Sequence, residues 1–177
     1  MKKSLIAASG AIALSGALLL ALSAVLSPVA QRRAEAERGE LLALLLPGST
    51  VFTEEAVTGE EAVTAAWQGQ GGWVVETTTA GYVGDVTLWV GVTEGGRVTG
   101  VVVRDMEETW GLGARALTDT AFLSQFLGTA GEAAVGEHVD AMTGATVTSK
   151  AIARGVNAAV GFVTGADVTS GATEWGG

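Results

Sequence analysis

The sequence predicts an α+β protein: a small antiparallel sheet packed with helices, which follows a single N-terminal transmembrane helix. Three features of the 177 residues support this fold class: an apolar N-terminal run, a Gly-punctuated stretch of β-type runs at 51–105, and two helical patterns after it. We expect a cytoplasmic tip and transmembrane anchor at 1–30, a helical stalk at 31–50, one folded domain at 51–165 and a flexible tail at 166–177.

The anchor is predicted from an uncharged run of 22 residues, Leu5 to Leu26, preceded by Lys2 and Lys3. About 20 apolar residues cross a bilayer as a helix, whereas the apolar core of a cleaved signal peptide has only about 7–15. We therefore expect an uncleaved, single-pass anchor in the cell (inner) membrane. The lysine-tipped start favours an extracytoplasmic domain, although three arginines at 32, 33 and 38 make the charge rule ambiguous.

Composition excludes several classes of site. The chain has no Cys and one His, which removes disulfides, thiol catalysis and cysteine zinc sites and argues against a histidine metal cluster. Ten Lys and Arg against nineteen Asp and Glu give a net charge of −9, a poor match to nucleic acid. We therefore expect no nucleic-acid partner, no metal ligand and no catalytic residue.

The elements follow in order along the chain. Residues 28–46 fit a charged and then Leu-rich helix that ends at Pro47-Gly48. Strand-like runs lie at 72–77, 82–93 and 97–104, and the Gly-rich step at 94–96 predicts a hairpin between the last two. One buried face is predicted by alternating apolar residues, which are Val86, Leu88, Val90 and Val92.

Two helices are predicted in the C-terminal half. Residues 114–127 carry an apolar stripe and end at Gly128. Residues 146–163 place Ile152, Val156 and Val160 at helical spacing. The Gly-, Thr- and Ala-rich residues from 165 onward are typical of a loose tail.

The stretch that carries chemistry is residues 140–150, with the sequence DAMTGATVTSK. Gly144 and Ala145 leave the backbone open just before Thr146 begins a helix, and a helix N-terminus favours an anion such as phosphate. Lys150 and Arg154 follow at spacings that put them on the same helix face as Thr146. The alternative is that the hydroxyl of Thr143 or Thr146 caps the helix and both cations are solvated; residue chemistry leaves both interpretations open.

The sequence also resembles a known family. The run Asp-x-x-Thr-Gly-Ala-Thr at 140–146 looks like the flavinylation motif of the FMN-binding domain family. Further matches stand upstream in the family's order, at 81–84, 90–92, 98–101 and 108–113. Together these motifs resemble the G subunit of Rnf-type ion-translocating electron transport complexes and, more distantly, the C subunit of the sodium-pumping NADH:quinone reductase. The resemblance covers residues 1–163.

The resemblance implies that Thr146 holds FMN through a covalent phosphoester bond. The implied phosphate neighbours are Thr143, Gly144, Ala145, Thr148 and, as a weaker candidate, Lys150. The implied loop facing the flavin ring contains Glu108, Thr109, Gly111, Leu112 and Gly113; otherwise this Gly-x-Gly stretch is a plain strand-to-helix connection. Met106 and Trp110 depart from the family pattern, where His and Pro are usual.

A second copy of the threonine motif, at 167–173, lies in the tail with no helix after it. We interpret it as a chance or vestigial copy, although a transferase that recognises only the extended motif could modify Thr173.

The predicted function is that of a membrane-anchored flavoprotein that carries electrons within an Rnf-type complex and is not catalytic alone. Its partners would be the other membrane and redox subunits, a flavin transferase for maturation, and membrane lipid. Two alternatives stay open: a non-redox extracytoplasmic binding or assembly module, and a flavin carrier of another electron-export chain.

Overall fold

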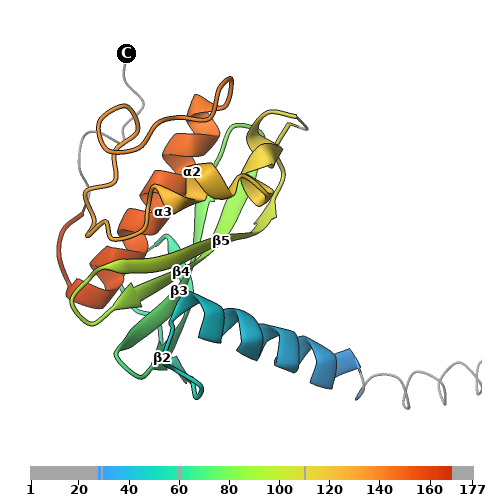
Figure 1. Ribbon diagram of the computed structural model, residues 1–177, viewed down its shortest axis with the longest axis vertical. Helices are drawn as coiled ribbons and strands as arrows, with labels where there is room; N and C mark the ends of the chain where they lie inside the picture. The colour runs from blue at the N-terminus through green and yellow to red at the C-terminus, as the bar shows by residue number, and fades with distance from the viewer. Residues whose placement is uncertain (1–27, 29, 60, 110, 169–177) are drawn as a thin grey trace, which may run out of the picture. The chain divides into compact units, whose positions relative to one another are not determined.

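The computed structural model describes residues 28, 30–59, 61–109 and 111–168 (Figure 1). Within them, five strands form one antiparallel sheet in the order β1-β2-β3-β4-β5, and helices pack on it, so the predicted α+β class is confirmed. The strands are β1 (Thr53–Glu55), β2 (Val63–Gly69), β3 (Gly72–Ala80), β4 (Asp85–Thr93) and β5 (Val98–Met106). The helices that follow are η1 (Gly113–Leu117), α2 (Thr120–Ser124) and α3 (Thr146–Thr164).

The chain divides into two compact units, between Glu40 and Leu41. The predicted membrane anchor at 5–26 lies outside the described residues. Among the helices that the structure does describe, none is long and apolar enough to cross a membrane. The anchor and the domain boundaries drawn from the sequence remain predictions.

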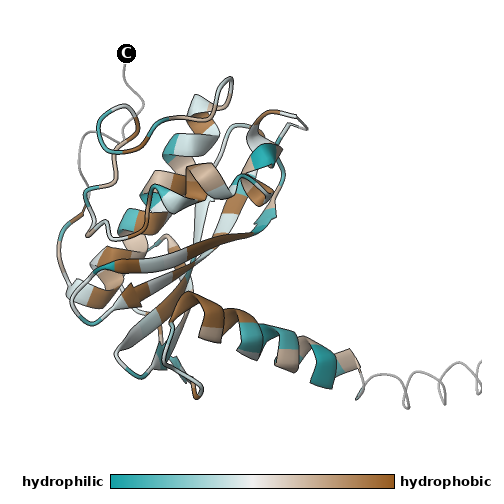
Figure 2. Ribbon diagram, viewed as in Figure 1, coloured by the Kyte–Doolittle hydropathy of each residue, from teal (hydrophilic) through white to brown (hydrophobic). Residues whose placement is uncertain are grey.

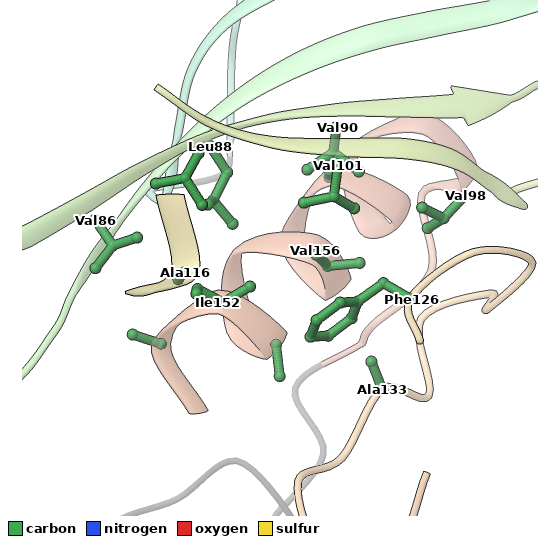
Figure 3. Packing of buried hydrophobic residues seen from close by; sticks show 14 of the residues in the cluster. Val86, Leu88, Val90, Val98, Val101, Ala116, Phe126, Ala133, Ile152 and Val156 are labelled. Atoms are coloured by element: carbon green, nitrogen blue, oxygen red, sulfur yellow. The ribbon is translucent and has the colours of Figure 1, made fainter. Parts of the chain in front are cut away.

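One face of the sheet is covered by α3. Val86, Leu88, Val90 and Val92 are all fully buried in this core, as the alternation in β4 predicts. The prediction of a single buried face is wrong, because Trp89 on the opposite face of β4 is also buried, in a second cluster. Ile152 and Val156 of α3 lie against these strands, and Phe126 fills the space beside Val98 (Figure 3). The apolar residues that recur along one face of residues 146–163 are therefore the ones that build the main core.

The opposite face of the sheet receives a leucine-rich segment, residues 41–46, which ends a helix over residues 30–45 (Figure 2). Leu42, Leu45 and Leu46 are buried in a second cluster, and the strand residues that they contact are Trp67, Val74 and Trp89. A Cβ added at Gly100 would lie 2.9 Å from Leu45 Cδ2, so small strand residues leave room for this segment. The Thr99 hydroxyl donates to the Leu45 carbonyl at 2.5 Å and fixes the segment's end.

One turn between strands lies where the sequence predicts it. Another turn makes a predicted strand shorter than expected. The predicted hairpin at 94–96 is confirmed, with Gly96 at φ +78° and Thr93 N donating to Arg97 O at 2.9 Å. The strand predicted from residue 82 begins only at Asp85, because Gly81 N donates to Gly84 O at 2.9 Å and closes a tight turn. The sequences of β1 and β2 show too little apolar–polar alternation to predict where these strands begin and end.

The single helix predicted at 114–127 is wrong. It is two short helices, η1 and α2, separated by Thr118 and Asp119. The Asp119 carboxylate accepts from Phe122 N at 3.0 Å and starts a new helix as its N-cap. Asp competes with the helical backbone in this way, and the apolar stripe alone does not reveal the break.

We predict that Gly91→Ala destabilises the domain by about 1–3 kcal/mol, the usual cost of overpacking a well-filled interior. A Cβ at Gly91 would lie 2.7 Å from the Leu45 carbonyl carbon, so the leucine-rich segment would have to lift. Urea unfolding of the detergent-solubilised chain measures the change. Gly95→Ala is the matched control, because its nearest atom would be 3.8 Å away, and equal midpoints for the two variants would contradict the close contact.

Candidate functional site

A cleft of about 400 Å³ opens where three segments meet: the β3–β4 turn, the loop after β5, and the N-terminus of α3. These segments lie at the same end of the sheet (Figure 1). The volume falls in the range of small-molecule and cofactor sites. The lining residues are Tyr82, Glu108, Thr109, Leu112, Gly113, Gly144, Ala145, Thr146, Val147 and Thr148.

The floor of the cleft is the start of α3. The N-cap is Ala145, with φ −134° and ψ 41°, and no side chain caps the first turn. Thr146 is the first residue of the helix and is exposed, while Gly144 before it adopts φ +76°. The alternative in which Thr143 or Thr146 is the helix cap is therefore wrong: the cap position belongs to a residue whose side chain cannot accept a hydrogen bond.

Ser149 holds this helix start in place from inside the core. Its buried hydroxyl donates to Ala145 O at 2.9 Å and accepts from Met142 N at 3.0 Å. These bonds tie the turn before α3 to the helix and leave the first-turn N–H groups pointing out of the helix end. Such a terminus attracts anions, since its N–H groups and the helix dipole both favour negative charge.

One wall of the cleft is the loop after β5. Its turn is closed by Leu112 N and Ala114 N, which both donate to Thr109 O, at 3.1 and 3.3 Å. Gly113 is buried, and a Cβ there would lie 2.6 Å from Thr148 Oγ1 and 2.8 Å from Glu108 Oε2. A residue without a side chain is therefore required where the loop meets α3.

The rim of the cleft carries exposed apolar side chains. Leu112 is 44% exposed and Tyr82 is 69% exposed. A Cβ at Gly144 would lie 3.1 Å from Leu112 Cδ2, so Leu112 lies over the turn that precedes α3. Apolar side chains beside a cleft can contact the apolar part of a bound ligand.

The structure brings together eight of the eleven site residues predicted from the sequence. They are Glu108, Thr109, Leu112, Gly113, Gly144, Ala145, Thr146 and Thr148. The other three predicted residues, Thr143, Gly111 and Lys150, are not among those that line the cleft. Two lining residues are not predicted from the sequence: Tyr82 lies in the matched motif at 81–84 but has no role implied by the resemblance, and Val147 carries no chemical signal.

The cations near α3 do not line the cleft. Arg154 donates through Nη2 to Ala80 O at 2.6 Å and thereby anchors the end of β3 to α3. Partial burial lowers the pKa of Arg154 from its ordinary value. Lys150 is half-buried on the first turns of α3. The anion-attracting character of the cleft therefore comes from the backbone of the helix start.

The remaining expectations concern the family departures and metals. Met106, at the end of β5, is half-buried and packs against the main core. Trp110 and the second motif's Thr173 lie outside the described residues. In the part of the chain that the structure describes, no group of three or more His, Cys, Asp or Glu side chains could hold a metal ion.

The comparisons with known proteins agree with the motifs. Residues 81–161 match the FMN-binding domain. The chain is 33% identical over 160 residues to the G subunit of the proton-translocating ferredoxin:NAD(+) oxidoreductase complex of Clostridium ljungdahlii, an alignment that covers 85% of each chain. It is 34% identical over 98 residues to the G subunit of the Na(+)-translocating ferredoxin:NAD(+) oxidoreductase complex of Acetobacterium woodii, covering 50% of this chain and 47% of that one. The chain therefore belongs to the FMN-binding domain family, in the group formed by the G subunits of ferredoxin:NAD(+) oxidoreductase complexes.

Proposed function

We propose that this protein is a membrane-anchored electron carrier whose FMN is bound covalently to Thr146, within an Rnf-type ion-translocating ferredoxin:NAD(+) oxidoreductase complex. The observation that carries the proposal is the exposed Thr146 at an uncapped helix N-terminus that lines a cofactor-sized cleft. The family membership supports the same interpretation.

The start of α3 fits the phosphate of FMN. A phosphodiester keeps one negative charge, and the uncapped first turn offers backbone N–H groups and the positive end of the dipole of a 19-residue helix. Gly144 and Ala145 give close access to that backbone. Thr148 is buried but also lines the cleft, and its hydroxyl would offer a further polar contact.

The other side of the cleft fits an aromatic ring system. Leu112 and Tyr82 present apolar surface there, and Gly113 lets the loop lie directly against α3. When bound, FMN supplies the electron chemistry, while the protein fixes its position and tunes its reduction potential. Electron transfer by FMN needs no acid–base pair among the residues that line the cleft.

Attachment requires a partner enzyme. The Thr146 oxygen would form a bond to the FMN phosphorus of FAD as its proton leaves, the bond between that phosphorus and the bridging oxygen would break, and AMP would depart. A flavin transferase would catalyse this exchange, which is a phosphoryl-type transfer that depends on positioning. Exposure of Thr146 gives such an enzyme access.

The carrier is proposed to sit in the inner membrane through its N-terminal apolar run, with the domain outside the cytoplasm and in contact with lipid and with the other membrane and redox subunits. The C. ljungdahlii and A. woodii relatives are named as subunits of ion-translocating complexes. The non-redox alternative treats the threonine motif as a helix cap only, and Ala145 at the N-cap supports the carrier over it.

Thr146→Val should abolish covalent flavin, because Val has the shape of Thr but no hydroxyl to form the phosphoester. Thr146 is exposed, so the fold should be kept. Intact mass and in-gel flavin fluorescence after denaturation, on protein expressed with its transferase, give the readout. Thr146→Ser, which keeps a hydroxyl, and Thr173→Val, in the second copy of the motif, are the matched controls and should keep the flavin. Flavin retained in Thr146→Val but lost in Thr173→Val would assign attachment to the other copy.

Gly113→Ala should leave the flavin attached but shift its visible spectrum and midpoint potential. The new Cβ would press on the Thr148 hydroxyl and the Glu108 carboxylate and displace the loop from α3. Gly95→Ala, in a hairpin with open space around it, is the control. A redox titration that superimposes on wild type would mean that the loop is only a connector.

The topology follows from the apolar run and the lysine-tipped start. Protease added to intact spheroplasts should digest the domain and leave the N-terminal anchor protected. Opening the cells should leave the digestion of the domain unchanged. It should make a cytoplasmic control protein accessible to the protease. A domain that resists protease until the cells are opened would place it on the cytoplasmic side.

A further inference from the structure

We propose that Glu108 is a positioning residue that latches the β3–β4 turn over the cofactor cleft, rather than a residue that acts on the flavin ring. The inference rests on the proposed FMN cleft and concerns what holds that cleft's rim in place.

The latch is a carboxylate that accepts from two successive backbone amides. Glu108 Oε1 accepts from Tyr82 N at 2.6 Å and from Val83 N at 3.4 Å, across 26 and 25 residues of sequence. Successive N–H groups at a turn form an anion-binding concavity. In this chain the concavity is occupied by the protein's own carboxylate.

Two glycines make room for the Glu108 carboxyl group, one in each segment that it joins. A Cβ at Gly81 would collide with Glu108 Oε1, and a Cβ at Gly113 would lie 2.8 Å from Glu108 Oε2. Glu108 is half-buried in the loop after β5. Its Oε1 is directed at the β3–β4 turn and its Oε2 at Gly113 of its own loop, which suits a structural link between the two segments.

The link matters because the turn carries Tyr82 at the rim. The turn's internal bond, Gly81 N to Gly84 O at 2.9 Å, closes the hairpin but does not attach it to the rest of the cleft. Among the described contacts, the amides of Tyr82 and Val83 bond to Glu108. Without this acceptor the turn would be free to move and the cleft to open to water.

Glu107 is the matched control. It precedes Glu108 and is exposed, and its side chain makes none of the turn's amide hydrogen bonds. Two variants of Glu108 separate geometry from charge. Glu108→Gln keeps an oxygen acceptor at the same reach, whereas Glu108→Asp keeps the charge but shortens the side chain by one methylene.

The experiment is hydrogen–deuterium exchange of the detergent-solubilised full chain, measured by mass spectrometry on peptides that cover residues 81–84. Glu108→Ala and Glu108→Asp should speed exchange there by roughly ten- to a hundredfold, because neither side chain reaches the turn's amides and their hydrogen bonds are lost. Glu108→Gln should restore most of the protection, and Glu107→Ala should match wild type. Equal exchange in Glu108→Ala and Glu107→Ala would overturn the latch.

A second readout tests the consequence for the cleft. On flavin-loaded chain, iodide should quench flavin fluorescence more strongly in Glu108→Ala and Glu108→Asp than in wild type, with Glu108→Gln near wild type. Faster exchange with unchanged quenching would refute control of the cleft by the latch. If no flavin mass is found at all, the proposed function fails, and the exchange measurement still decides whether Glu108 holds the turn.

Discussion

The close packing of α3 against the centre of the sheet is the contact on which the rest of this domain depends. At Gly155 a Cβ would lie 2.8 Å from both Leu88 Cδ1 and Thr77 Oγ1, so the helix rests directly on β3 and β4. The approach is close enough that the Thr77 hydroxyl is buried with no hydrogen-bond partner. Leaving a buried polar group unpaired is costly, so the apolar packing around Gly155 must outweigh it.

Once α3 is fixed on the sheet, hydrogen bonds along its length set where its first residue lies. Thr79 donates to Ala151 O at 2.9 Å, and Arg154 donates to Ala80 O at 2.6 Å. Farther along, the Asn157 amide pairs with both backbone groups of Ala133, at 3.0 and 2.9 Å, and holds the preceding loop. The start of α3 is thereby held by a rigid scaffold, as a site that must position a cofactor requires.

The sequence predicted the parts of the molecule that repeat or that carry a motif. The alternating apolar residues of β4 and the helical spacing in α3 are confirmed as core positions, whereas the burial of Trp89 on the other face of β4 is not indicated by that alternation. The eight residues found together at the cleft were reached through short motifs, because motifs record backbone requirements such as Gly113. Two features are not predicted from the sequence, for different reasons. The break at Asp119 is a local cap that the apolar stripe hides, whereas the place of Tyr82 at the cleft depends on a distant contact, between its turn and Glu108.

The two faces of the sheet contact different parts of the domain. One face holds α3 and, at its start, the cleft, while the other holds the leucine-rich segment. Gly91 and Gly100, paired in β4 and β5, admit Leu45 there, just as Gly113 and Gly155 admit close contact on the side of α3. Glycine is costly in a strand, so its placement under Leu45 is best explained by this contact. The same strands therefore join the leucine-rich segment to the residues that would hold the flavin, and in the proposed carrier this shared sheet would keep the redox centre at a fixed position within its domain.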